Sequence, residues 1–241
     1  MLFNRTFYVG MAFFFSISMA FAQTSNKVEA APETLEGFRL SYEEMYDIAN
    51  PKKLPHRIFY KKPSQGPHAA WFDAVKKGDL DTVRRMVDKG QDIEVKDEAS
   101  LGQTALGWAA FIGYQDMVEY LVGKKANLLA TDRADVYNVF KSAVLGKNIV
   151  TVKYLYPLLK DNIVIDEQEP DGETLVMVAA SNDRQDIVKY LLELGANVNI
   201  VSMQKDADAL SYACERGYKD MVDILIKAGA INHKTKKSSC E

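Results

Sequence analysis

The chain has 241 residues, of which 47% are apolar and 26% charged, and its formal net charge is −3. This balance is typical of a globular protein and not of a disordered one. A nucleic-acid binder would carry a dominant basic face, so we expect no nucleic acid as a partner. Two cysteines and three histidines are too few for a disulfide-framed miniprotein or a Cys/His zinc cluster, and we expect no metal or cofactor.

Residues 1–22 have the pattern of a secretory signal peptide. Arg5 is the only charged side chain before Lys27, and an apolar, Phe-rich middle ends in Ala20-Phe-Ala22, a small-x-small cleavage sequence. The alternative is an uncleaved membrane anchor, but the apolar stretch is shorter than the roughly 20 residues that a span needs. We therefore expect cleavage after Ala22 and a bacterial periplasmic location, or alternatively secretion, with no membrane insertion once the signal is removed.

Residues 23–66 form an N-terminal extension that does not repeat. Ser41 and Glu44 have the spacing of a capping box, which predicts a short helix that runs to Ala49. The following stretch, residues 52–63, is basic, aromatic and punctuated by prolines. Two interpretations are open: a cap over the exposed end of the first repeat, or an additional arm that contacts a partner.

From residue 67 onward the sequence repeats. Each unit has a pair of small or apolar residues in a first helix, a turn that often contains glycine, a second helix with an apolar stripe and a return loop. The second residue of the pair falls at Val75, Ala110, Ala143, Ala180 and Cys214, at steps of 35, 33, 37 and 34 residues. One such unit cannot bury its apolar face alone, so the units are expected to stack.

The repeated residues resemble the ankyrin motif T-P-L-H-x-A-A-x-x-G, followed by I/V-V-x-x-L-L-x-x-G-A. Thr104-Ala-Leu-Gly-Trp-Ala-Ala-Phe-Ile-Gly113 matches the first part, and Ile187-Val-Lys-Tyr-Leu-Leu-Glu-Leu-Gly-Ala196 matches the second. The resemblance implies an all-α solenoid of about five helix-turn-helix units with short β-hairpin-like loops. We place the repeat domain at 67–234, with units near 67–99, 100–133, 134–168, 169–203 and 204–234, followed by a frayed polar tail at 235–241.

Some residues depart from the family motif. Its proline and histidine are missing from every unit, and Asp183 stands where glycine is expected. The third unit has Pro157 in its second helix and lacks the Gly-Ala turn, so we expect this unit to be distorted and to be a possible bend of the solenoid.

The resemblance implies protein–protein recognition without catalysis. No histidine has a serine or cysteine partner in a catalytic motif, and no glycine-rich phosphate loop is present, so we do not expect an enzyme. The first hypothesis is an exported module, monomeric when free, that binds and inhibits or shields a periplasmic enzyme such as a wall-degrading one. This is similar in kind to ankyrin proteins of the self-protection or immunity type. The alternatives are a scaffold in an envelope or oxidative-stress-defence complex and a secreted effector that binds a host protein.

The candidate binding residues follow the small pairs, at positions where packing is expected to direct side chains outward onto the concave face. These concave-face positions are Lys76-Lys77, Phe111-Ile112, Val144-Leu145, Ser181-Asn182 and Glu215-Arg216. The two central apolar pairs predict an exposed hydrophobic patch with a polar rim, which is typical of a protein-binding surface. The alternative is that the N-terminal extension or the distorted third unit covers them.

The hairpin tips add a second set of candidates, rich in acidic residues, which favours a partner with a basic surface. The set consists of Asp97, Glu98, Leu101, Asp132 and Arg133. We expect Cys214 to act as a small buried side chain and favour a free Cys240 thiol. The alternative, a disulfide between the two, stays open and would require the tail to fold back.

Overall fold

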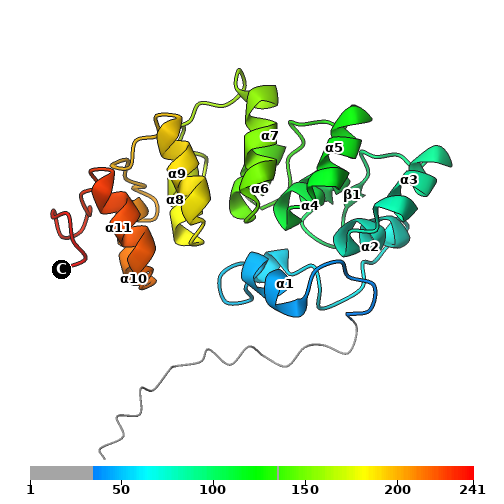
Figure 1. Ribbon diagram of the computed structural model, residues 1–241, viewed down its shortest axis with the longest axis horizontal. Helices are drawn as coiled ribbons and strands as arrows, with labels where there is room; N and C mark the ends of the chain where they lie inside the picture. The colour runs from blue at the N-terminus through cyan, green and yellow to red at the C-terminus, as the bar shows by residue number, and fades with distance from the viewer. Residues whose placement is uncertain (1–34, 135) are drawn as a thin grey trace, which may run out of the picture. The chain divides into compact units, whose positions relative to one another are not determined.

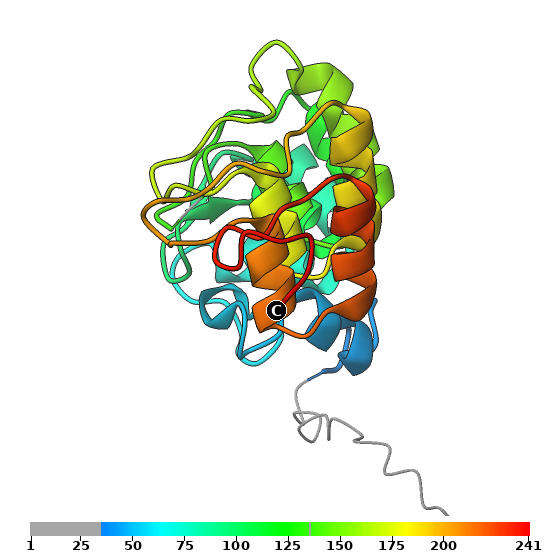
Figure 2. The same cartoon turned by 90° about the vertical axis from the view of Figure 1, so that its left-hand side faces the viewer.

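The computed structural model describes residues 35–134 and 136–241, and this part of the chain is mainly helical. The predicted signal peptide at 1–22 lies outside the described residues. The repeat domain consists of five helix pairs, each with an inner and an outer helix (Figures 1 and 2). The pairs are α2 (Ala69–Lys77) with α3 (Leu80–Asp88), α4 (Ala105–Ile112) with α5 (Gln115–Gly123), α6 (Val139–Leu145) with α7 (Ile149–Leu159), α8 (Leu175–Ser181) with α9 (Gln185–Glu193), and α10 (Ala209–Glu215) with α11 (Lys219–Lys227).

Polar caps define the starts of the inner helices. Thr104 accepts a hydrogen bond from the backbone N–H of Gly107, and Thr174 accepts one from that of Met177. Each threonine thereby satisfies one of the N–H groups that a helix leaves free in its first turn. Gly113 of the motif ends α4 in a left-handed conformation, with φ +93°, which glycine adopts without strain.

The third unit needs its glycine for another reason. Gly146 has φ −68°, and a Cβ atom there would collide with the carbonyl oxygen of Phe111 in the neighbouring unit. The glycine therefore permits close packing of two units. Helix α7 has eleven residues and contains Pro157, which is consistent with an irregular unit.

The core runs through the stack between the helix pairs. All residues of α4, α6 and α8 are buried, whereas the outer helices bury one stripe each, such as Met117, Val118 and Leu121 of α5. The hairpins are short: β1 (Lys96–Asp97) pairs antiparallel with β2 (Gln103–Thr104), and a single bridge joins Ser202 to Ala207. The predicted solenoid of helix-turn-helix units is thus confirmed.

Residues 35–66, which we call the arm, hold a helix, α1 (Tyr42–Ile48), and a 3-10 turn at Pro55–Arg57. The predicted capping box is confirmed, because Ser41 accepts from the N–H of Glu44 and Glu44 accepts from that of Ser41. Within the described residues, no helix is long and apolar enough to cross a membrane.

Candidate protein-binding surface

The arm lies over the centre of the predicted binding surface. The ring of Phe59 packs edge-on against that of Phe111, with a centroid distance of 6.3 Å. Phe111, Ile112, Val144 and Leu145 are at most 3% exposed. The prediction of an exposed apolar patch at these four residues is therefore wrong, because the patch is part of the core that the arm shares with units two and three. The structure agrees with the alternative in which the N-terminal extension covers these residues.

Arg184 fixes one end of the arm. Its guanidinium donates to the carbonyl oxygens of Asp47 and Ile48 at the C-terminal end of α1, at 3.1 and 2.7 Å, and its Nε donates to that of Leu145 at 3.2 Å. A cation at this end satisfies carbonyls that a helix leaves free and suits the helix dipole. Burial lowers the pKa of Arg184, and the nearby charge of Asp47 acts against this shift. One side chain thus joins the arm to units three and four.

Arg57 fixes the other end of the arm. Its guanidinium lies 2.9 Å from the Asp132 carboxylate, and both side chains are at most 3% exposed. The same guanidinium donates to Gln103, whose amide donates in turn to Ser142. Asp132 was predicted as a partner-contacting hairpin residue, and this is wrong: its charge is used inside the protein to hold the arm.

Lys76 and Asp97 form a second buried pair. Their charged atoms lie 2.6 Å apart, and the side chains are 6% and 0% exposed. Trp108 donates its indole N–H to the same carboxylate, and Lys76 also donates to Ser64 of the arm. Both residues were predicted to face solvent or a partner, and both predictions are wrong, because the arm and the first hairpin close over them.

Two further concave-face positions are buried by local contacts. Ser181 and Asn182 are 6% and 8% exposed, and both side chains donate to the carbonyl oxygen of Val178 in the preceding turn of α8. The expectation that this pair faces outward is therefore wrong as well. Polar side chains at a helix C-terminus that bond back to the helix need no solvent.

Six of the predicted site residues keep some exposure. Glu215 and Arg216, in the last unit, are exposed. At the hairpin tips Glu98 and Arg133 are exposed and form an ion pair with each other. Leu101 is half-buried at φ +56° beside them. Lys77 is also half-buried, with its ammonium 5.9 Å from the centre of the Phe38 ring in the arm. Whether these residues contact a partner stays a prediction.

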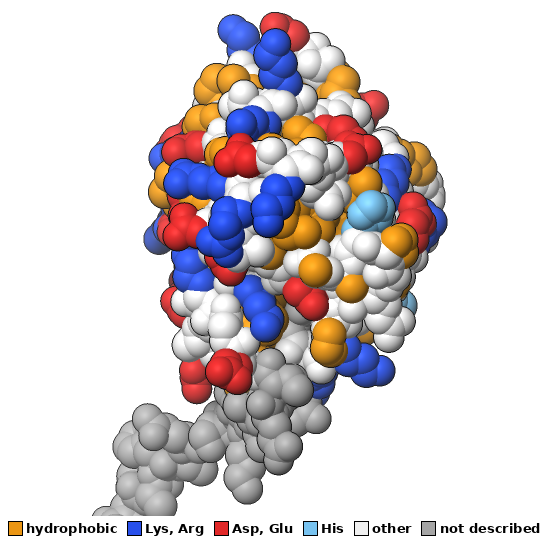
Figure 3. Space-filling view, turned by 90° about the vertical axis from the view of Figure 1, so that its right-hand side faces the viewer, with side chains coloured by type: hydrophobic (Ala, Val, Ile, Leu, Met, Phe, Trp, Pro, Cys, Tyr) orange, Lys and Arg blue, Asp and Glu red, His pale blue; other side chains and the backbone are white. Residues whose placement is uncertain are grey.

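The two ends of the stack differ in the residues that cover the terminal repeat. The α2–α3 end carries Lys, Arg, Asp and Glu side chains interspersed with apolar ones (Figure 3). In this unit the charged residues Arg84, Arg85 and Lys89 are exposed. A terminal repeat has a neighbour on one side only, so a polar outer face keeps it in solution. Because both signs of charge are mixed here, this end favours neither an acidic nor a basic partner surface.

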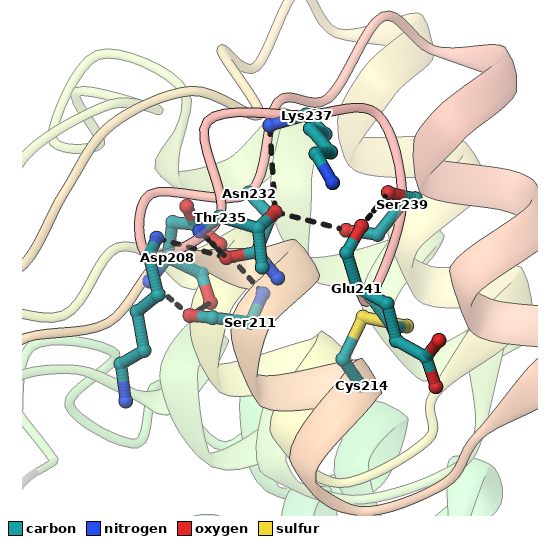
Figure 4. The surroundings of a disulfide bond; sticks show 10 residues. Asp208, Ser211, Cys214, Asn232, Thr235, Lys237, Ser239 and Glu241 are labelled. Carbon is teal, nitrogen blue, oxygen red and sulfur yellow. Dashed lines mark hydrogen bonds between the residues drawn. A yellow bond between two sulfur atoms is a disulfide. The ribbon is translucent and has the colours of Figure 1, made fainter.

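At the C-terminal end, the tail packs against the last repeat. Cys214 of α10 forms a disulfide with Cys240, with a Cα–Cα distance of 5.4 Å (Figure 4). The expectation of a free Cys240 thiol and a frayed tail is wrong. Residues 232–239 fold back through hydrogen bonds of their own, such as Asn232 N–H to the Lys237 carbonyl at 2.9 Å. The backbone N–H of His233 also donates to Asp208, which ties the tail to the start of α10.

A partly buried polar cluster lies under the hairpin between units three and four. Lys141, fully buried, pairs with Glu169 and lies 4.0 Å from Asp171. Burial raises the pKa of the nearby Glu173 carboxyl, while a hydrogen bond from Tyr212 acts in the opposite direction. In the described part of the chain, no group of three or more His, Cys, Asp or Glu side chains is arranged to hold a metal ion.

The sequence reasoning missed Arg57 and Arg184, the residues that hold the arm. The sequence offered only a weak signal for each: Arg57 directly precedes the apolar run Ile58-Phe-Tyr60, and Arg184 directly precedes the outer helix of the fourth unit. Neither pattern indicates the distant partner, since Arg57 pairs 75 residues away and Arg184 bonds to carbonyls 136 and 137 residues away.

Comparisons with known proteins agree with this architecture. The family model for ankyrin repeats (three copies) matches residues 71–164 and 139–237. The ankyrin repeat and KH domain-containing protein mask-1 of Caenorhabditis elegans is 26% identical over 171 aligned residues, covering 61% of this chain and 6% of that protein. Palmitoyltransferase AKR1 of Lachancea kluyveri is 30% identical over 152 residues, covering 63% and 20%. M-phase phosphoprotein 8 of Homo sapiens is 29% identical over 151 residues, covering 61% and 17%.

The chain therefore spans at most a fifth of the length of these three relatives, and their activities belong to the whole proteins. What they share with it is the repeat, which is generally a non-enzymatic module for binding other proteins. The family match covers more than half of the described chain and coincides with the five helix pairs. The chain belongs to the ankyrin-repeat family.

Proposed function

We propose that this protein is an exported binding module that inhibits or shields an enzyme of the bacterial periplasm, in the manner of a self-protection or immunity protein. We expect no catalysis from the module itself, so it would change the activity of a partner by covering or holding it. The proposal therefore assigns the effect to binding alone, at one module for each enzyme molecule.

The observation that carries the export part of the proposal is the Cys214–Cys240 disulfide. Disulfides persist in oxidising compartments such as the bacterial periplasm and are rare in the reducing cytosol. The predicted signal peptide at 1–22 supports the same location independently. A disulfide in the last unit also stabilises the folded module in a compartment that lacks the cytosolic chaperones.

The arm restricts where an enzyme can bind. Since the arm covers Phe111 and its apolar neighbours, the predicted concave-face positions that stay fully exposed are those of the last unit, Glu215 and Arg216, while Lys77 is half-buried beside the arm. The hairpin tip at Glu98 and Arg133 is the other predicted contact that stays exposed. Both are charged, so this contact would weaken as ionic strength rises.

The test is expression of the full chain, followed by cell fractionation and purification of the mature protein with its partner. We expect a periplasmic protein that begins at Gln23, has no free thiol after denaturation and co-purifies with an enzyme. Titration of that enzyme with the purified module should abolish its activity at one equivalent. A chain that retains Met1 with two free thiols, or an enzyme that stays fully active in the complex, would contradict the proposal.

A further inference from the structure

The five outer helices repeat one another position by position, so their exposed residues can be compared directly. In four of them the second residue is an exposed aspartate: Asp81 in α3, Asp116 in α5, Asp186 in α9 and Asp220 in α11. A carboxylate in the first turn of a helix is stabilised by the positive end of the helix dipole. Aspartate is therefore a residue that the fold itself favours at this position.

Helix α7 departs from this pattern. Its second residue is Val150, whose side chain is 56% exposed, and its first turn contains no acidic residue. Near the other end Leu158 is 46% exposed, at the position that Lys89 and Lys124 occupy in the first two units. Over its eleven residues α7 has one charged side chain, Lys153. Folding therefore does not account for this valine and leucine, since other units place charged residues at the same exposed positions.

The solvent-facing apolar residues of α7 lie on one face of the helix. They are Val150, Tyr154, Pro157 and Leu158, at the spacing i, i+4, i+7 and i+8 that places residues on one helix face. Tyr154 is half-buried and Pro157 is exposed. Lys153 shares this face, but its ammonium lies 5.2 Å from the centre of the Tyr190 ring, so its charge is directed toward α9. We call the four apolar residues the α7 stripe, which extends over about 12 Å of the helix axis.

The charges around the α7 stripe balance. Helix α7 lies between α5 and α9 in the row of outer helices (Figure 1). The exposed charged residues of these three helices and their C-caps are four acids and four lysines: Asp116, Glu119, Asp186, Glu193, Lys124, Lys153, Lys160 and Lys189. Asp186 and Lys189 also pair with each other at 3.1 Å, and Asp116 pairs with Arg39 of the arm at 2.8 Å. This surround therefore selects neither an acidic nor a basic partner segment.

The α7 stripe is open to a partner in the folded protein. Val150 and Leu158 have their 56% and 46% exposure with the arm docked, so a partner can reach them without moving the arm. A stable dimer interface contains about 20–30 residues on each side, far more than the four of the stripe, which argues against a second copy held by the stripe alone. A contact of this size suits one short segment of a partner, such as one apolar face of a helix.

We propose that the α7 stripe binds a short segment of a partner protein that presents aliphatic or aromatic side chains and has no excess of either charge. Removal of apolar surface from water on both sides supplies the affinity, and Tyr154 lies in the middle of the contact. Because the contact is apolar, it does not weaken as ionic strength rises, unlike the charged contact proposed for the last unit. This inference rests on the proposed function in that the module binds another protein, and it adds a second surface for that binding.

The test uses the mature full-length protein as bait for a random peptide library displayed on phage. We expect the selected peptides to be rich in Leu, Ile, Phe or Trp, to have no excess of either charge and to bind equally tightly at low and high salt. The double variant Val150→Asp, Leu158→Lys gives α7 the charges of α5 at these positions, so it should melt no lower than wild type and bind the peptides at least tenfold more weakly. The matched control is Ile231→Asp, which changes a 51% exposed side chain of the last unit and should leave binding unchanged.

A selection that yields no peptide, peptides of one charge sign whose affinity falls with salt, or peptides that bind the double variant as tightly as the wild type would overturn the inference. A wild-type protein that dimerises in sedimentation velocity while the double variant is monomeric would assign the α7 stripe to a second copy and overturn it too. Enzyme inhibition separates the two proposals. If an enzyme is inhibited but the selected peptides do not depend on the stripe, the inference falls and the proposed function stands. If the peptides bind as expected but no enzyme is inhibited, the proposed function falls alone.

Discussion

Replacing Phe111 with alanine tests whether the arm is part of the folded core. Phe111 is fully buried, packs edge-on against Phe59 of the arm and against Trp108 of its own helix, and lies beneath the guanidinium of Arg57 at 5.8 Å. Loss of a buried phenylalanine ring costs about 3–5 kcal/mol of unfolding free energy, because transfer energy is lost and a cavity remains. For a protein of this size that corresponds to a fall in Tm of about 10 °C.

The assay is thermal and urea unfolding followed by circular dichroism. Val164→Ala is the control on an exposed aliphatic residue, and it should change the unfolding free energy by less than about 0.5 kcal/mol. The part of the loss that belongs to the arm is measured by a double-mutant cycle with Phe59→Ala, which should give a coupling of about 1 kcal/mol. A cycle between Phe111 and Leu225, in α11, should be additive. If Phe111→Ala were as stable as the Val164 control, or if the Phe59 coupling were absent, the docking of the arm would be refuted.

Three further variants test other parts of the fold. Cys240→Ser should lower the unfolding free energy by up to about 3.5 kcal/mol, the entropy of closing the 26-residue loop to Cys214, and a reductant should destabilise the wild type but not the variant. Arg184→Ala removes the donor to the carbonyls of Asp47, Ile48 and Leu145, two of these bonds being buried, and should cost about 2–4 kcal/mol, whereas the exposed Arg216→Ala should cost less than about 0.5 kcal/mol; equal costs would refute the cap on α1. The pKa of Glu173 is higher in the folded than in the unfolded state, so its contribution to stability falls as pH rises above the ordinary value of 4.5. Glu173→Gln should therefore gain stability relative to wild type between pH 4.5 and 7.5 in urea titrations, and a constant difference would contradict this.

The periodic part of the fold is predictable from the sequence because its signals are local. The threonine caps, Gly113 and the apolar stripe of α5 each act within a few residues, and five copies of one pattern reinforce each other. The helix at 42–48 follows from the Ser41–Glu44 capping box in the same way.

The candidate surface was not predictable to the same degree, because its exposure depends on contacts across long stretches of chain. Phe111 looks like a surface residue within its own unit, but Phe59 and Arg57 of the arm pack against its ring. Asp97 and Asp132 have the composition of solvated hairpin acids, yet each is neutralised by a cation from another element. Cys240 looks like a tail thiol until the path of residues 232–239 is known.

The arm covers the centre of the concave face in the free protein. The most direct test is amide hydrogen exchange of the unmodified mature protein, measured on peptides that cover residues 42–49. A seven-residue helix is unstable alone, so protection of the α1 amides requires that the helix be docked. We expect the amides of Met45 and Ala49, which close α1, to exchange at least about a hundredfold more slowly than in an unstructured chain, and we expect the same of the α4 amides. Exchange of α1 at the unprotected rate, with α4 still protected, would contradict it.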